Sequence, residues 1–358
     1  MGESPAPGHQ PTRSRWRIAR RIVIITGLVS VALTCVVAAT IYVAGNHLIG
    51  RIARIPHVFQ GMNSATRPSV PARYRQAMTI LVVGSDSHSP TAASSNGTGQ
   101  RFSDALMLVH VNASRRAVAV ISIPRNSWVR VPGFGMRSFY QVLDLGGPAL
   151  LVRTMENLTG VRIDHYMVLD FAGLRGVVQA LGGVSVDIPQ GGRRDGVTFH
   201  EGVNYLGARA AWVYATTASS QAGCRCWQRD GLPGGDLSRM QRQQNLIRAI
   251  LAKVASSHLL TDPIAGYRLL DALTRAVSVD STFSDAQMIS LALRLAALSG
   301  SDVTFLTAPV RSLGWRDHQG VVYLNLAQCA SLWNAVRQDS VAAWAAGHQA
   351  TLTPQVPS

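Results

Sequence analysis

Two aspartates and one arginine stand at the ends of three short apolar runs in the N-terminal half of the chain. Asp86 follows the first run, Asp104 begins the second, and Arg125 comes directly after the third and its closing proline. Carboxylate oxygens suit a hard divalent cation, and a guanidinium group can bind two phosphate oxygens at once. No Ser-His-Asp or Cys-His arrangement for acyl transfer is evident, so these residues indicate phosphoryl chemistry.

A second group of polar side chains lies at the start of a predicted helix. A Gly/Pro turn ends at Asp236, a suitable N-cap, and Arg239 and Gln243 follow one turn apart, where free backbone N–H groups favour an anion. Arg242 is expected to point further toward solvent. The expected buried stripe consists of apolar residues at helical spacing: Leu237, Met240, Ile247, Leu251 and Val254. We predict that Arg239, with Arg229 before the turn, binds phosphate; the alternative for such arginines is a solvated basic face.

The apolar runs must bring these side chains together. Runs 104–111 and 116–123 are separated by a turn of hairpin length, which predicts antiparallel neighbours in a sheet. If the run 78–84 lies parallel to 116–123, its end arrives at the same sheet edge. The two aspartates and Arg125 would then gather there, beside the polar loop 87–100.

Helices and strands alternate through the rest of the chain. The pattern predicts helices over 148–160, 171–183, 262–276, 284–298 and 325–338, and strands over 164–170, 184–189, 303–307 and 321–324. Such alternation is typical of an α/β fold, and we expect a three-layer α/β/α sandwich with a mixed central sheet.

The basic charge is concentrated next to an apolar segment. The formal net charge is +15, and residues 1–21 and 46–77 each contain five arginines, against one acidic residue in the first segment and none in the second. Residues 22–45 lack charge and are long enough to cross a bilayer, which favours membrane contact over nucleic-acid binding. The positive-inside rule predicts a cell-membrane protein with its N-terminus in the cytoplasm and its main domain outside. A cleaved signal peptide, with its site near residues 37–39, is the alternative.

The cysteines allow little cross-linking. Cys35 lies in the apolar segment, so Cys224, Cys226 and Cys329 can form at most one intramolecular disulfide among them. We expect Cys329 to pair with one of the other two. The Cys-x-Cys pair has no neighbouring histidine or second pair and is a weak zinc signal.

Several segments, in order, resemble the LytR-CpsA-Psr family: residues 84–88, 101–111, 120–133, 146–174, 181–189 and 228–245. The resemblance extends over roughly residues 78–256. It implies an extracytoplasmic α/β/α domain behind one membrane helix, with an apolar tunnel for a lipid tail. It also implies a magnesium-dependent phosphotransferase that moves a glycopolymer from a polyprenyl-pyrophosphate carrier to peptidoglycan.

The resemblance assigns roles by position. Asp86 and Asp104 would hold Mg²⁺ and, with Arg125, form the catalytic group, and Asp86 is the candidate general base. The residues at the pyrophosphate would be Arg101, Arg125, Arg229, Arg239 and Gln243. Asn126 stands where the family has an aspartate, Arg101 is displaced by one position, and Trp227 replaces one of two clamping arginines. Arg137 or Arg225 could substitute for the missing cation.

The predicted organisation is a cytoplasmic tail (1–21), a membrane helix (22–45), a basic spacer (46–77), a catalytic domain (78–256), a C-terminal α/β extension (257–348) and a disordered tail (349–358). The substitutions at Asn126 and Trp227 leave a second hypothesis, a catalytically weak protein that binds the lipid carrier or scaffolds the cell-wall machinery. A transcriptional regulator does not fit the predicted topology, because most of the chain would lie outside the cell.

Overall fold

The computed structural model describes residues 48–85, 105–216, 236–256, 262–295, 298, 300–317 and 319–351. The chain divides into two compact units, Met1–His47 and Leu48–Ser358, and every described residue lies in the second. The predicted span over 22–45 therefore lies outside the described residues. Within the described part of the chain, no helix is both long and apolar enough to cross a membrane.

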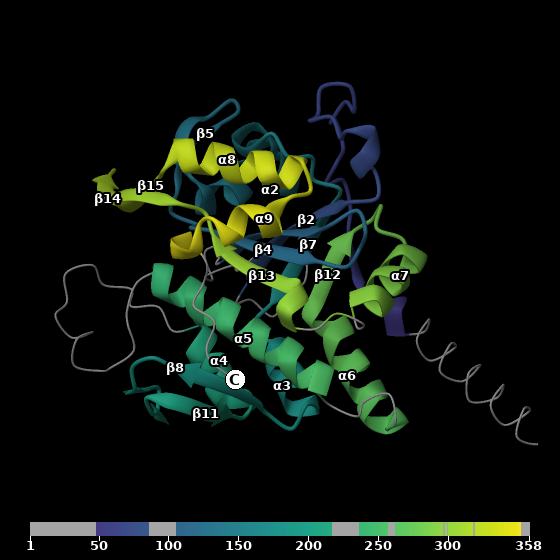
Figure 1. The fold of residues 1–358 in the computed structure, drawn as a ribbon, viewed down its shortest axis with the longest axis vertical. Helices are drawn as coiled ribbons and strands as arrows, with labels where there is room; N and C mark the ends of the chain where they lie inside the picture. The colour runs from purple at the N-terminus through teal and green to yellow at the C-terminus, as the bar shows by residue number, and fades with distance from the viewer. Residues whose placement is uncertain are drawn as a thin grey trace, which may run out of the picture. The chain divides into compact units, whose positions relative to one another are not determined.

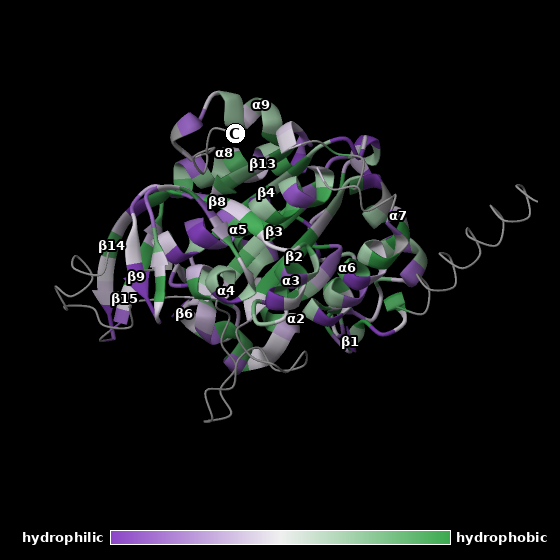
Figure 2. Ribbon diagram, turned by 90° about the horizontal axis from the view of Figure 1, so that it is seen from below, coloured by the Kyte–Doolittle hydropathy of each residue, from purple (hydrophilic) through white to green (hydrophobic). Residues whose placement is uncertain are grey.

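A seven-stranded mixed sheet forms the centre of the second unit (Figure 1). In spatial order its strands are β1 (Ala53–Ile55), β12 (Val277–Asp280), β7 (His165–Asp170), β2 (Met78–Ser85), β3 (Ala105–Val111), β4 (Val118–Ile123) and β13 (Val303–Thr307). All eight residues of β2 and all six of β4 are buried, as their continuous apolar sequences predict. Figure 2 shows the hydrophobic colour along β2, β3 and β4.

Helices cover both faces of this sheet (Figure 1). One face carries α3 (Leu174–Ala180), α4 (Ala208–Thr216), α5 (Asp236–Ser256), α6 (Pro263–Ala276) and α7 (Asp285–Leu295); the other carries α2 (Phe139–Thr159), α8 (Leu326–Arg337) and α9 (Val341–Ala346). Alternate residues of one strand face opposite sides. Ile80 and Val82 belong to the core under α5, whereas Leu81 and Val83 belong to the core under α2.

Four small antiparallel pairs lie outside the central sheet: β5 (Trp128–Val131) with β6 (Gly135–Ser138), β8 (Val184–Ile188) with β11 (Gly202–Leu206), β9 (Gly192–Arg194) with β10 (Val197–Phe199), and β14 (Val310–Arg316) with β15 (Gln319–Leu324). The strands predicted over 184–189 and 321–324 exist, but neither joins the central sheet. Local patterns identify a strand without identifying its partner. Three 3-10 turns complete the described elements: η1 (Ala72–Tyr74), η3 (Gly300–Asp302) and η4 (Gln349–Thr351).

The interpretation of residues 46–77 as a spacer is wrong for the part that the structure describes. β1 pairs in parallel with β12 at the sheet edge, and Ile55 and Val58 are buried. Further on, Arg67, whose side chain is 10% exposed, forms an ion pair with the buried Glu156 of α2, with Nη2 and Oε1 2.7 Å apart. A strand of three residues is too short to show a period in the sequence. Since β12 and β13 come from beyond residue 256, strands from both sides of that position share one sheet.

The helix predicted over 148–160 is the second half of α2. The backbone angles of Gly146 and Gly147 are not helical, so two helical segments of α2 meet at a kink there. The helix ends at Gly160, which has φ 62°, a left-handed value that glycine adopts readily. The predicted end is therefore confirmed.

Cys329, for which we expected a disulfide, is a free cysteine in the described structure, and its expected partners Cys224 and Cys226 lie outside the described residues. Cys329 is a free thiol on the buried side of α8, with 2% of its surface exposed, and its Sγ lies 3.5 Å from the carbonyl oxygen of Pro309. Burial raises its pKa to about 11, so the thiol stays protonated at neutral pH. Cysteine spacing in a sequence carries no information on burial, which decides the state of this residue.

Candidate functional site

Three central strands start or end at the same edge of the sheet. β3 is antiparallel to both β2 and β4, with Gly84 opposite Ala105 and Leu106 opposite Ile123. This arrangement confirms the predicted pairing, because the exits of β2 and β4 and the entry of β3 coincide. Four of the predicted site residues lie outside the described residues: Asp86, Arg101, Asp104 and Arg229. Asp86 is the residue directly after β2, and Asp104 is the residue directly before β3. Both aspartates are therefore next in sequence to strand residues at this edge.

Close packing fixes the backbone at this edge. A Cβ atom on Gly84 would lie 2.4 Å from Cε2 of Phe171 and 2.8 Å from Cβ of Ala105. The backbone N–H of Phe171 donates to the carbonyl of Ser85 at 2.9 Å, which holds the phenyl ring over the glycine. A larger residue at position 84 would displace the ring or the strand.

Arg125 is held between the end of β4 and the start of α2. Its carbonyl accepts a hydrogen bond of 2.9 Å from the backbone N–H of Tyr140. The guanidinium carbon lies 5.9 Å from the centroid of the Tyr140 ring, within the range of a cation–π contact. Arg125 is half-buried, so its side chain is oriented while it remains accessible.

A buried glutamine places the start of α5 over the same edge. The Gln244 amide donates to Oγ of Ser122 and to the carbonyl of Leu306, the latter at 2.9 Å, which links α5 to β4 and β13. Ser122 precedes Arg125 by three residues. The first turns of α5 and the end of β4 therefore lie together, which brings Arg239 and Gln243 to the end of the sheet that carries Arg125.

Arg242 was predicted to point toward solvent, and this prediction is wrong. It is 6% exposed, and its Nε donates to the carbonyl of Tyr214 in α4 at 2.8 Å. Burial lowers the pKa of Arg242 to about 10; the nearby Tyr214 raises it, and the positive charge of Arg239 lowers it further. Arg239 is 4% exposed, so two guanidinium groups are buried close to each other.

The error comes from the assumption that α5 buries one stripe only. α5 lies between the sheet and α4, so a second flank is buried as well. Leu246, Ala249 and Ile250 are buried on that flank, whereas Leu251 of the predicted stripe is 43% exposed. Leu246, Ala249 and Ile250 follow Arg242 by four, seven and eight residues, which places them on the same side of a helix. This spacing was the signal in the sequence that could have revealed the second buried flank.

Gln243 has the capacity to bind a ligand. It is 1% exposed, and neither Nε2 nor Oε1 has a hydrogen-bond partner in the described structure. A buried amide without partners costs free energy, and native structures retain few of them. With Arg239 one turn away, the arrangement offers a hydrogen-bond donor and a positive charge to an anion.

The same edge also offers a carboxylate that reasoning from the sequence missed. Asp170 ends β7 opposite Ser85 in the register, and its Oδ1 accepts a hydrogen bond of 2.9 Å from the backbone N–H of Ala172. No group of three His, Cys, Asp or Glu residues with metal-site geometry occurs among the described residues. The carboxylate of Asp170 is an oxygen donor of the kind that a hard cation such as Mg²⁺ prefers.

Comparison with known proteins gives a consistent set of relatives. The LytR_cpsA_psr family model matches residues 57–338. A probable cell wall biosynthesis protein LcpB of Corynebacterium glutamicum is 30% identical over 266 residues, which cover 72% of this chain and 60% of the relative. A polyisoprenyl-teichoic acid–peptidoglycan teichoic acid transferase TagU of Enterococcus faecalis is 25% identical over 240 residues, covering 66% of this chain and 73% of the relative. The chain thus spans about three fifths of the length of the first of these relatives.

Solved structures share the fold. The crystal structure of TagV of Bacillus subtilis superposes with a TM-score of 0.58 at 18% identity, covering 74% of this chain and 98% of that one. The structure titled TagT bound to LI-WTA gives a TM-score of 0.57 at 22% identity, with 78% and 97% coverage. At these identities the likeness concerns the mixed α/β architecture around a central mixed sheet.

Proposed function

This chain belongs to the LytR-CpsA-Psr family, and on that premise we propose that it transfers a polyprenyl-pyrophosphate-linked glycopolymer to peptidoglycan. The observation that carries the proposal is the start of α5, where buried Arg239 and the unpartnered amide of Gln243 lie over the sheet edge that carries Arg125. The names of the TagU relatives, which are teichoic acid transferases, support the same substrate class.

The chemistry is a phosphoryl transfer. A peptidoglycan hydroxyl oxygen forms a bond to the phosphorus that carries the glycopolymer, and the bond from that phosphorus to the bridging oxygen breaks. Polyprenyl phosphate leaves, and the hydroxyl proton passes to a base, for which Asp86 is the candidate. Arg125, Arg229 and Arg239 neutralise the charge that develops on the bridging oxygen, while Gln243 donates to a phosphate oxygen and Arg101 adds a further cation.

Mg²⁺ is the proposed cofactor. Asp86 and Asp104 would hold it through carboxylate oxygens, and Asp170 is placed to assist from the neighbouring strand. When bound, the ion would reduce the negative charge of the pyrophosphate. The protein residues orient the two phosphates relative to the acceptor hydroxyl, which is the larger part of catalysis in reactions of this class.

We also propose that the chain crosses the cell membrane once, through residues 22–45, with the described unit outside the cytoplasm. The charge distribution supports this topology, because the arginines of residues 1–21 precede an uncharged segment of 24 residues. An apolar tunnel between the sheet and the helices on the α5 side would take the polyprenyl tail, in keeping with the three-layer α/β/α arrangement expected for the family.

Trp227 and Asn126 motivate a weaker enzyme as the second candidate. With one clamping arginine replaced, the protein would bind the lipid carrier tightly and turn it over slowly, or hold it for other cell-wall enzymes. The two candidates differ in turnover and not in binding, so one assay separates them.

The test uses the full chain, purified in detergent, with Mg²⁺, a polyprenyl-pyrophosphate-linked glycan and isolated peptidoglycan. We expect polyprenyl phosphate to be released as glycan becomes covalently attached to the insoluble peptidoglycan. Both products should disappear in Asp104→Ala and persist in Glu201→Ala, which changes an exposed carboxylate. Tight binding of the lipid without either product would support the scaffold, and product formation unchanged in Asp104→Ala would contradict the assigned site.

A further inference from the structure

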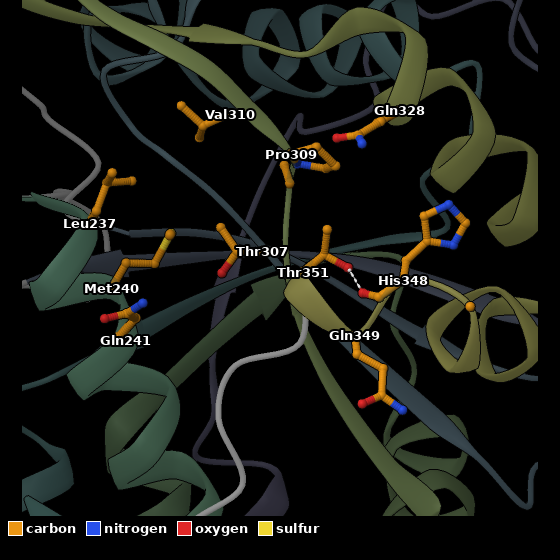
Figure 3. Close-up of a pocket in the computed structure, with 12 residues that line it drawn as sticks. Leu237, Met240, Gln241, Thr307, Pro309, Val310, Gln328, His348, Gln349 and Thr351 are labelled. Carbon is orange, nitrogen blue, oxygen red and sulfur yellow. Dashed lines mark hydrogen bonds between the residues drawn. The ribbon is translucent and has the colours of Figure 1, made fainter. Parts of the chain in front are cut away.

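A cavity of about 630 Å³ lies beside the start of α5, on the side of β13 (Figure 3). Its walls come from α5, from the segment after β13, from the first turn of α8 and from the C-terminal residues 347–351. The volume is within the range of roughly 300–1,000 Å³ that is usual for small-molecule sites. Nothing in the proposed transfer reaction uses this cavity.

The described lining combines polar amides with apolar side chains. None of its described residues is Asp, Glu, Lys or Arg, whereas it contains three side-chain amides, from Gln241, Gln328 and Gln349. Each amide offers two N–H donors and one oxygen acceptor. Apolar side chains of Leu237 and Met240 lie with Gln241 on the α5 wall, across the cavity from Gln328 and Gln349 (Figure 3). This combination suits an uncharged polyhydroxylated ligand and does not suit a pyrophosphate, which requires cations.

The wall opposite α5 is held rigidly. His348 stacks on Trp344 with ring centroids 4.0 Å apart and planes 4° from parallel, and Trp344 Nε1 donates to Oγ of Ser331 at 3.0 Å. His348 Nδ1 lies 2.8 Å from the carbonyl oxygen of Trp344, so Nδ1 must donate, and in the neutral imidazole Nε2 is left as an acceptor. The hydroxyl of Thr351 donates to the carbonyl of His348 at 2.7 Å, which closes the turn.

The cavity and the proposed phosphate site lie on different flanks of the same helix, α5. Gln241 and Gln243 are two residues apart on α5 and, at 100° per residue, lie on roughly opposite flanks of the helix. The cavity and the anion-binding side chains are therefore separated by about one helix diameter, roughly 10–12 Å. A glycan joined to a phosphate at Arg239 could pass the start of α5 and enter the cavity.

The C-terminal wall lies beyond the region that the family model matches. The family match ends at residue 338, whereas Trp344, His348 and Gln349 follow it. The cavity thus combines a family element, α5, with a segment outside the matched region.

We propose that this cavity is a subsite for uncharged sugar residues of the glycan substrate. The identity of the glycan rests on the proposed function, but sugar binding itself does not. The donor glycopolymer and the peptidoglycan acceptor share the chemistry that the cavity recognises. Hydroxyl groups would bond with the amides of Gln241 and Gln349 and with Nε2 of His348, while a sugar C–H face would pack on Met240.

The binding test needs no transfer. The full chain in detergent is titrated with the tetramer of N-acetylglucosamine, an uncharged sugar oligomer, and followed by saturation-transfer NMR. Combined Gln241→Leu and Gln349→Ala substitutions, both at exposed positions, should raise the Kd about tenfold, as expected for the loss of two hydrogen-bonding groups. Gln179→Ala, at an exposed position on α3, should leave the Kd unchanged. Absence of binding, or equal Kd values in the double variant and the unsubstituted protein, would overturn the proposal.

Two further experiments test whether the sugar in the cavity belongs to the glycopolymer donor or to the peptidoglycan acceptor. Inorganic pyrophosphate should bind the double variant and the unsubstituted protein with the same Kd, and it should bind Arg239→Ala more weakly. A defect in the phosphate site is therefore distinguished from a defect in the sugar subsite. In the transfer assay, a raised KM for the lipid-linked donor in the double variant assigns the cavity to the glycopolymer, and a raised KM for peptidoglycan assigns it to the acceptor. Unchanged values of both KM would contradict a sugar subsite.

Discussion

Arginine side chains pack on both sides of the central sheet, a half-buried one on the α2 side and two buried ones on the α5 side, and their surroundings differ. On the α2 side, Nε and Nη2 of Arg67 bond with Glu156 at distances from 2.7 to 3.2 Å, and the same carboxylate accepts the backbone N–H of Ile163 at 2.9 Å. On the α5 side, Arg239 and Arg242 lie close enough for each charge to affect the other, next to the unpartnered amide of Gln243.

The difference separates a structural role from a binding role. A buried charge whose partners are complete holds segments together, here residues 48–77 onto α2. A buried amide without partners, beside two cations, makes the folded state less stable until an anion binds. The comparison predicts that substitutions on the α2 side act on stability and that substitutions on the α5 side act on function.

The largest effect is expected on the α2 side. Arg67→Ala leaves the carboxylate of Glu156 buried without its cation, so we expect a loss of about 3–5 kcal/mol in the free energy of unfolding. Urea denaturation followed by tryptophan fluorescence measures it. Arg73→Ala, at an exposed position of η1, is the matched control and should change little. A loss below about 1 kcal/mol, typical of surface ion pairs, would show that Arg67 is not a structural arginine.

Arg239→Ala should have the opposite profile. Removal of one charge clamp from a phosphoryl-transfer site is expected to lower kcat about 10²–10³-fold. The urea midpoint should fall less than in Arg67→Ala, because the loss of the repulsion with Arg242 offsets part of the lost contacts. Arg268→Ala, which changes an exposed arginine of α6, is the control for general loss of charge. Comparable loss of stability in Arg239→Ala and Arg67→Ala would remove the distinction between the two regions.

Gln243→Leu tests whether the buried amide serves binding at the expense of stability. The leucine fills a similar volume without an unsatisfied amide, so the protein should gain up to about 1–3 kcal/mol of stability. Transfer activity should fall about tenfold through the loss of one hydrogen bond to phosphate. A variant that loses stability instead would mean that the amide of Gln243 has a structural partner.

The smallest effect concerns pH and a third buried ionic group, Asp280 beside His165. Burial alone would raise the pKa of Asp280, but hydrogen bonds from His165, Thr282 and the backbone N–H of Tyr166 outweigh it and hold the pKa below its ordinary value of 3.8. The ionised carboxylate therefore contributes stability that is fully present above pH 3.8 and is lost as the pH falls through the lower, folded-state pKa.

Urea midpoints measured between about pH 2.5 and pH 5 test this behaviour. The unsubstituted protein should lose stability steeply across the acidic part of that range, and Asp280→Asn should show a shallower slope from a lower starting value. Equal slopes in the two proteins would assign the acid sensitivity to other carboxylates.

The sequence predicts the centre of the fold well and its periphery poorly. Continuous apolar runs and a short turn identified β3 and β4 as antiparallel neighbours, and Gly160 marked the end of α2. These features depend on neighbouring residues. The packing of β1 on β12 and the pairing of β8 with β11 depend on contacts between distant segments, for which a single sequence has no local signal.

The same limit applies to the candidate site. Arg239 and Gln243 were selected because they lie near a helix start, and the structure brings them to the expected sheet edge. Arg242 was misplaced because the second buried flank of α5 depends on α4. The roles of Asp86 and Asp104 remain predictions, supported by the strands that lead to them.

Arg239 and Gln243 are proposed to bind the pyrophosphate of a lipid carrier. ³¹P NMR of a short-chain polyprenyl pyrophosphate, titrated with the full chain in detergent, tests it directly. We expect both phosphorus resonances to shift and broaden with the unsubstituted protein and with Arg268→Ala, and to stay at their free positions with Arg239→Ala. Equal shifts with all three proteins would show that Arg239 does not bind the pyrophosphate.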